Sequence, residues 1–148
     1  MKTLRKTIDI NASKESVWKI LTEDKYTRDW YAAFGEGAHA ITSWQLDSKV
    51  IFKDASDNGL IGKIVGNKPN ELLDIEYTGT LVKGKEEYEN PDTVAIKGGH
   101  ETYLLSKKGN STNLSILTDM SEEFVDSMSA AWDKALIKLK TLAESIKN

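Results

Sequence analysis

The two histidines, His39 and His100, have the greatest capacity for acid–base chemistry, because imidazole titrates near neutral pH. Neither lies in a recognisable catalytic motif. His100 is followed by Glu101 and then by Tyr103, a set that could transfer protons at a cavity wall. In an extended strand, however, His100 and Glu101 point to opposite faces. The sequence therefore assigns no catalytic residue, and His100 is interpreted as a surface or strand-end histidine.

Motifs for metals and nucleotides are incomplete. The chain has no cysteine and only isolated histidines, so no metal site is predicted. Residues 54–59 resemble the first half of a calcium-binding loop, but Val65 occupies the twelfth position, where a glutamate is required. We interpret this segment as a hairpin turn. Residues 35–37 lack the third glycine of a dinucleotide fingerprint, which is Ala40 here, so no cofactor is predicted.

The first secondary-structure elements are predicted from hydrophobic periodicity. Residues 3–10 alternate between apolar and polar side chains, which predicts a strand with one solvent-exposed face. Ser13 is placed to cap a short helix over about 14–22, because its hydroxyl can accept from the free amides of a first turn. Asp24 marks the start of a second helical piece that ends near residues 35–37.

From residue 38 to residue 118, extended segments alternate with turn residues, which is typical of an antiparallel meander. The side chains expected to share one face within each strand are Thr42, Trp44 and Leu46; Val50 and Phe52; Leu73, Ile75 and Tyr77; Tyr103 and Leu105; and Leu114 and Ile116. The charged segment 82–99 interrupts this rhythm and is interpreted as a long exposed loop.

The last segment carries one long amphipathic pattern. Asp119 and Glu122 are interpreted as a variant capping box, and apolar residues then recur at helical spacing from Phe124 through Trp132 to Ile146. This predicts a helix of about six or seven turns. The predicted fold class is α+β.

Composition excludes several classes of protein. The 148 residues, 39% hydrophobic and 29% charged, fit one globular domain over 1–148. A net charge of −3 gives no support to a nucleic-acid interface, and no apolar run approaches the roughly 20 residues of a membrane-spanning helix. No apolar signal segment follows the first residues, and the absence of cysteine fits a reducing compartment. We therefore expect a cytoplasmic protein.

Three motifs in this order carry a family resemblance: Val17-Trp18-x-x-Leu21-Thr22, then Trp30, then Trp132-x-x-x-Leu136-x-x-Leu139-Lys140. Over nearly its whole length the chain resembles the SRPBCC, or START-like, helix-grip superfamily. Within it, the chain resembles the branch related to the activator of the heat-shock protein 90 ATPase homologue. The resemblance implies an antiparallel sheet curved around the long C-terminal helix, with a cavity between them.

The resemblance also implies that a set of mostly aromatic side chains lines this cavity, although packing in a core is the commoner role of such residues. Two tyrosine hydroxyls would orient a ligand, while tryptophan and methionine would form its walls. The expected cavity residues are Trp30, Phe34, Trp44, Phe52, Ile75, Tyr77, Tyr103, Phe124, Met128 and Trp132.

Three hypotheses for the function follow. The first is non-catalytic binding of a small hydrophobic or amphipathic molecule, a lipid or an aromatic metabolite, in this cavity. The second is an interaction module resembling the heat-shock protein 90 ATPase activator, with a chaperone as partner, exposed charges at 83–92 and a role in stress response. The third is a cyclase- or hydrolase-type enzyme. A buried carboxylate in the cavity would favour it, whereas Asp74 and Glu76 are expected to face water.

Overall fold

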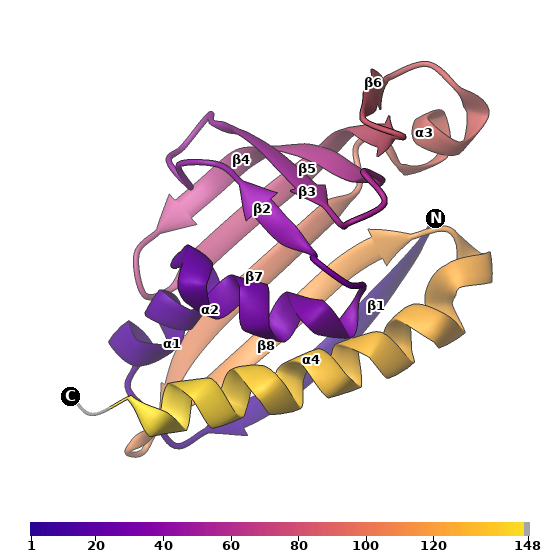
Figure 1. The fold of residues 1–148 in the computed structure, drawn as a ribbon. Coiled ribbons are helices and arrows are strands. Elements are labelled where there is room, and N and C mark those ends of the chain that lie inside the picture. Colours follow the sequence, from indigo (N-terminus) through magenta and orange to yellow (C-terminus); the bar gives the residue numbers. More distant parts are fainter. Residues whose placement is uncertain (147–148) are drawn as a thin grey trace.

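A strand and two short helices precede the rest of the sheet, and a long helix ends the fold (Figure 1). The computed structural model describes residues 1–146. The helical elements are α1 (Lys14–Thr22), α2 (Asp24–Trp30), the 3-10 turn η1 (Tyr31–Ala33), α3 (Pro91–Ile96), the 3-10 turn η2 (Glu122–Phe124) and α4 (Val125–Ser145). The strands are β1 (Lys2–Ile10), β2 (His39–Ile41), β3 (Lys49–Lys53), β4 (Gly59–Lys68), β5 (Leu72–Val82), β6 (Lys85–Glu87), β7 (His100–Lys108) and β8 (Ser111–Met120).

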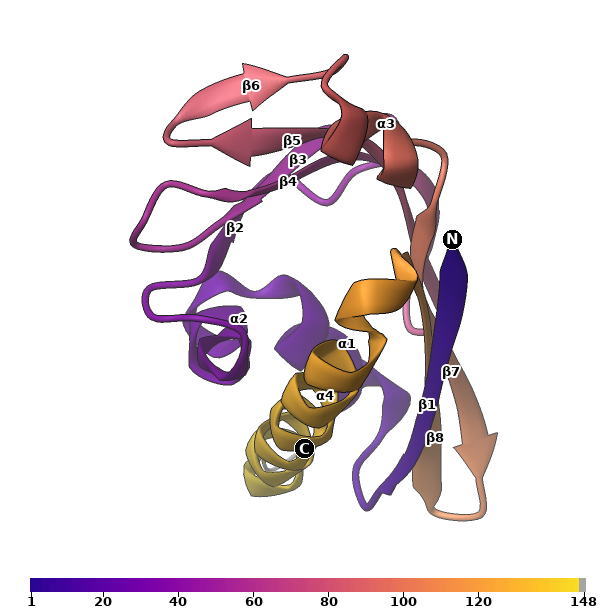
Figure 2. The ribbon, with the colours of Figure 1, turned by 90° about the vertical axis from the view of Figure 1, so that its right-hand side faces the viewer.

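The strands form one antiparallel sheet in the order β1-β8-β7-β5-β4-β3-β2, with β6 paired to β5 beside this path. Register shifts between Ile61 and Gly62 and between Ile64 and Gly66 interrupt the β4–β5 pairing. Such bulges bend a strand and increase its twist. Figure 2 shows the sheet curled, with α4 lying along its concave side. The predicted α+β helix-grip fold is confirmed.

The start of α1 and its link to α2 follow the sequence prediction. The Ser13 hydroxyl accepts a hydrogen bond from the Ser16 amide at 3.1 Å, which satisfies one free donor of the first turn. The indole Nε1 of Trp30, at the end of α2, donates to the Ile20 carbonyl at 3.0 Å. This buried contact fixes the two short helices against each other.

Helix α4 is held against β1 by charged groups as well as by its apolar face. The Lys6 ammonium lies 2.8 Å from the Asp133 carboxylate, and Lys140 donates to the Asp9 carbonyl at 2.7 Å. Its buried side chains recur at helical spacing: Trp132, Ala135, Leu136, Leu139 and Ala143. Within residues 1–146, none of the helices is both long enough and apolar enough to cross a membrane.

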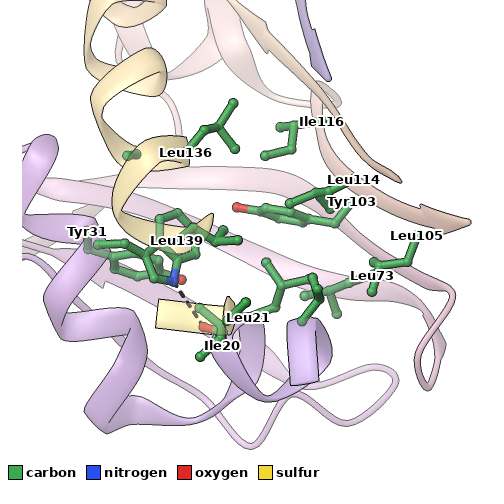
Figure 3. Packing of buried hydrophobic residues seen from close by; sticks show 14 of the residues in the cluster. Ile20, Leu21, Tyr31, Leu73, Tyr103, Leu105, Leu114, Ile116, Leu136 and Leu139 are labelled. Atoms are coloured by element: carbon green, nitrogen blue, oxygen red, sulfur yellow. Dashed lines mark hydrogen bonds between the residues drawn. The ribbon is translucent and has the colours of Figure 1, made fainter. Parts of the chain in front are cut away.

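The tightly packed part of the core lies where α1 and the second half of α4 meet the sheet (Figure 3). Ile20 and Leu21 from α1 face Leu73 on β5, and Leu139 from α4 approaches the same region. Ile20 and Leu139 are completely buried. Burial of such aliphatic side chains stabilises the fold by about 1.5–3 kcal/mol each relative to exposure.

The predicted capping role of Asp119 is wrong. Asp119 belongs to β8, where its carboxylate accepts hydrogen bonds from the Thr3 hydroxyl at 2.5 Å and from the His100 amide at 2.8 Å. The residue therefore joins neighbouring strands. Helix α4 begins after η2 with no side-chain cap of its own at Phe124.

The prediction of a long exposed loop over 82–99 is also wrong, because this segment contains β6 and α3. The Asn90 side chain accepts from the Thr93 amide at 2.8 Å, and Pro91 occupies the first turn of α3. An asparagine cap followed by proline is a normal helix start. The many charges of the segment concealed this signal.

Thr42, Trp44 and Leu46 were expected on one strand face, but β2 ends at Ile41. Trp44 has a positive φ of 63°, which no regular strand allows. Its amide donates to the Thr42 hydroxyl at 3.1 Å, and its carbonyl accepts from the Asn67 amide group at 2.7 Å. Side chains thus satisfy the backbone groups that a strand would have paired.

Candidate functional site

A cavity of about 250 Å³ lies between the concave face of the sheet and the first half of α4. Residues from α2 and η1, from strands β2, β3, β4, β5, β7 and β8, and from α4 contribute to its wall. The expected residues that line it are Trp30, Phe34, Phe52, Tyr77, Tyr103, Met128 and Trp132. That these side chains bind a ligand remains a prediction.

The other three expected residues lie elsewhere. Ile75 is completely buried in the core beside the cavity. Trp44 packs against Phe52, with ring centroids 6.4 Å apart, and does not line the cavity. Phe124 is 52% exposed and lines an adjoining hollow between α3 and the start of α4, which shares Leu60, Tyr77, Thr118 and Met128 with the cavity. These three positions do not contribute to the cavity wall.

Trp132 is the centre of the aromatic wall. Its ring meets Phe34 edge-on at 4.8 Å between centroids, and the Trp30 and Tyr103 rings lie at 6.0 Å and 6.2 Å. These distances fall within the range in which aromatic rings attract one another. The Trp132 indole Nε1 is buried and has no hydrogen-bond acceptor among the described residues. This part of the wall is therefore aromatic, with one buried N–H donor that has no partner among the described residues.

A polar cluster interrupts the apolar wall at the inner surface of the sheet. The Tyr77 hydroxyl donates to Glu101 Oε1 at 2.8 Å, and the Tyr103 hydroxyl donates to Glu101 Oε2 at 2.5 Å. The Thr118 hydroxyl lies 3.2 Å from the Tyr77 oxygen. Glu101 is only 9% exposed. We call Tyr77, Glu101, Tyr103 and Thr118 the Glu101 cluster.

Strand register explains why these four side chains meet. Ile75 on β5 is paired with Glu101 on β7, and Glu101 is paired with Thr118 on β8. Paired residues of neighbouring strands point to the same face, and so do residues two apart on one strand. Tyr77 and Tyr103 therefore flank Glu101 on the concave face.

Burial dominates the electrostatics of the Glu101 cluster. Loss of hydration raises the pKa of the Glu101 carboxyl, and the hydrogen bonds from Tyr103 and Tyr77 oppose this change without cancelling it. Burial and the nearby Glu101 charge raise the pKa of the Tyr77 and Tyr103 phenols well above the usual value. Tyr31, another residue of the cavity wall, is affected in the same way. Both tyrosines of the cluster are therefore protonated donors at neutral pH.

The opposite part of the cavity wall is polar and more exposed, which makes it the mouth. It is formed by His39 and by the β3–β4 turn from Lys53 to Gly59. Only glycine fits at position 59, because a Cβ there would lie 1.7 Å from the Phe52 carbonyl oxygen. This close approach brings the ends of β3 and β4 together beside the mouth.

His100 lies on the outer face of the sheet, as expected for a surface or strand-end histidine. Its Nδ1 is 2.8 Å from the Asp74 carboxylate, and its Nε2 is 3.8 Å from Glu76. The hydrogen bond to Asp74 is the main cause that raises the pKa of His100. Within residues 1–146, no three His, Asp or Glu side chains form a group that could hold a metal ion.

Sequence reasoning missed Glu101, Thr118 and Tyr31 as cavity residues. The signal for Glu101 was present, because it lies two residues before Tyr103 and so shares its face. Thr118 likewise continues the inward positions of β8, two residues after Ile116. Tyr31 had no such signal, since it follows Trp30 in an irregular helical turn.

Comparison with known proteins identifies the fold alone. No protein-family model matches the chain, and no curated protein matches it in sequence. Solved structures do match over nearly the whole length. Protein MLL2253 from Mesorhizobium loti has a TM-score of 0.77 at 14% identity, covering 99% of this chain and all of that one.

Two further structures share the fold. The Aha1 dimer from Colwellia psychrerythraea has a TM-score of 0.70 at 19% identity, and the match covers both chains completely. CalU16 from Micromonospora echinospora has a TM-score of 0.67 at 17% identity, covering 97% of this chain and 76% of that one. These structures share the helix-grip fold that the family resemblance predicted, and an Aha1 is among them.

Proposed function

We propose that this protein binds one small, largely apolar molecule in the cavity between the sheet and α4, without converting it. The observation that carries the proposal is the cavity itself, with aromatic walls and one buried polar cluster. Apolar concave sites with a few placed polar groups are the usual design of small-molecule sites. We place this function in one domain over 1–148 and in the cytoplasm.

The size of the cavity narrows the class of ligand. A volume of about 250 Å³ is just below the roughly 300–1,000 Å³ typical of small-molecule pockets. It suits a compound of one or two rings, or a short chain, better than a lipid with two acyl chains. A longer molecule would have to extend into the adjoining hollow of about 530 Å³, which shares Tyr77, Thr118 and Met128 with the cavity. Of the two expected ligand classes, we propose the aromatic metabolite, because the cavity wall is aromatic.

A matched pair of variants tests this proposal. Ala38 lines the cavity, so Ala38→Phe should fill part of it, whereas Ala32→Phe places the same side chain on the exposed surface of η1. Intrinsic tryptophan fluorescence is recorded during titration with aromatic and short-chain compounds, because Trp30 and Trp132 line the cavity. We expect saturable quenching at one equivalent in the wild type and in Ala32→Phe, and at least about tenfold weaker binding in Ala38→Phe. Equal affinities in all three proteins would contradict the proposed site.

Acid–base catalysis on the bound molecule is a second candidate function. It is favoured by one observation, the buried Glu101 carboxyl, whose pKa is raised and which lies within hydrogen-bond distance of two phenols. Mass spectrometry of each bound compound after incubation tests it. Product formation that Glu101→Gln abolishes without loss of binding would establish an enzyme, and unchanged ligand would leave binding as the function.

The hypothesis of a chaperone-interaction module applies if none of the compounds changes the tryptophan fluorescence. An Aha1 is among the structures of the same fold, and β6 carries exposed charges such as Lys85 and Glu86. Glu86 lies 2.7 Å from Lys49 on β3, so part of this charge is already paired within the chain. A pull-down at low salt, where exposed charges are least screened, would then detect a chaperone partner.

A further inference from the structure

Glu101 is a buried acid without a basic partner among the residues that the structure describes. Within residues 1–146, no Lys, Arg or His nitrogen lies within 4.0 Å of its carboxylate. Its two hydrogen bonds come from neutral phenols. A carboxylate has about four positions that accept hydrogen bonds, so Glu101 retains capacity for another donor. Burial of an acid is costly unless a positive charge or further donors compensate it.

The walls around this acid suit an organic cation. The rings of Trp30, Phe34 and Trp132 surround the same cavity, with Trp132 at their centre. The faces of such rings attract ammonium groups, most strongly when water is excluded. The cavity therefore holds a buried acid and aromatic rings within one small space, whereas a ligand carboxylate beside Glu101 would be repelled.

We propose that the cavity selects molecules with an aromatic body and a protonated amine, and that the amine forms an ion pair with the Glu101 carboxylate. This inference rests on the proposed binding function and gives the chemical class of its ligand. The tyrosines of the Glu101 cluster hold the carboxylate in place, and the apolar walls hold the aromatic body. Binding makes and breaks no covalent bond.

Three compounds with the same body test the proposal: naphthylmethylamine, naphthylmethanol and naphthoic acid. Their affinities are measured by isothermal titration calorimetry at neutral pH. We expect the amine to bind roughly 10- to 100-fold more tightly than the alcohol, as a charge-assisted hydrogen bond predicts, and the acid to bind most weakly. This series needs only the wild-type protein, so it decides the matter even where a variant fails to fold.

A matched pair of variants locates the preference. Glu101→Gln keeps the side-chain size but removes the charge, and should lower the affinity for the amine to that for the alcohol. Glu76→Gln removes the same charge from the outer face of the sheet and should leave the preference intact. Circular dichroism verifies that both variants are folded.

The possible results separate the two proposals. If the alcohol binds and the amine has no advantage, or if the advantage survives in Glu101→Gln, the amine assignment is overturned and the binding function stands. If none of the three compounds binds, and no compound of the fluorescence titration binds either, both the amine assignment and the binding function are overturned. A preference for the amine that is lost only in Glu101→Gln supports both.

Discussion

The two halves of the concave face are built from the same strands but differ in what they contain. In the half next to α1, the inward residues are aliphatic, such as Leu73, Leu105 and Leu114, and helix α4 fills the space between them with Leu139. In the half next to the start of α4, the inward residues include Glu101. One half is closely packed (Figure 3), and the other encloses a cavity of about 250 Å³.

This difference separates stability from function. The aliphatic half gains its stability from burial, and nothing there can recognise a ligand beyond its shape. The other half contains a buried acid, a costly feature that packing alone would not require. Polar groups kept at such a cost are typical of binding or catalytic sites. The contrast along β7, from Leu105 to Glu101, locates the candidate site.

Truncation should affect the two halves to different extents, and this is the largest effect that we predict. Leu139→Ala leaves a void among fully buried neighbours, so the free energy of unfolding should fall by about 2–5 kcal/mol. Met128→Ala should lower it by about 1 kcal/mol or less, because Met128 is half-buried and already borders a cavity. Urea unfolding followed by far-ultraviolet circular dichroism measures both changes. Equal losses would show that the two halves are packed alike.

The Glu101 cluster should show an intermediate effect that depends on pH. Tyr103→Phe removes a donor from the buried carboxylate, which should lower the free energy of unfolding by about 1–3 kcal/mol at neutral pH. The folded-state pKa of Glu101, already raised, should rise further. The free energy of unfolding therefore falls as pH increases from the unfolded pKa of about 4.3 through the folded pKa of Glu101. The total fall should be larger in the variant than in the wild type.

The control for this experiment is Tyr26→Phe, on α2 and outside the Glu101 cluster. Urea unfolding of both variants at pH 4 and pH 7 gives the comparison. The tyrosine–glutamate contact would be shown to be unimportant by a Tyr103→Phe effect that matches the control at both pH values.

The outer face of the sheet should give the smallest effect. The hydrogen bond to Asp74 raises the folded-state pKa of His100, so its stabilisation is complete below the unfolded pKa of about 6.5 and is lost as pH rises through the folded value. Both side chains are partly exposed, so Asp74→Asn should lower stability by only about 0.2–1 kcal/mol at pH 5.5. The difference from the wild type should shrink at pH 8.5, as measured by thermal unfolding. A loss as large as that of Tyr103→Phe would contradict the contrast between the two faces.

Much of the fold could be predicted from the periodicity of hydrophobic residues in the sequence. The alternation in β1, the Ser13 cap of α1 and the long pattern of α4 are local signals, and the structure confirms each of them. Trp44 could not be predicted in this way, because its positive φ depends on hydrogen bonds with distant residues such as Asn67. The curvature of the sheet came from the family resemblance.

The candidate site could be predicted only in part. Residues such as Trp132 were identifiable as apolar and inward-facing, but period alone does not distinguish a side chain that lines a cavity from one that fills a core. Ile75 and Tyr77 share a face, yet only Tyr77 borders the cavity. The empty volume depends on how strands far apart in sequence curl around α4. The ligand class rests on Glu101, which strand alternation could have identified.

Native mass spectrometry of the protein, purified gently from its own cells, tests the central claim most directly. We predict a species heavier than the 16.5 kDa chain by the mass of one small molecule, present in the wild type and in Ala32→Phe and reduced in Ala38→Phe. A retained molecule in equal amounts in all three proteins would place it outside the cavity. A bare chain that also ignores every compound in the titrations would contradict the account.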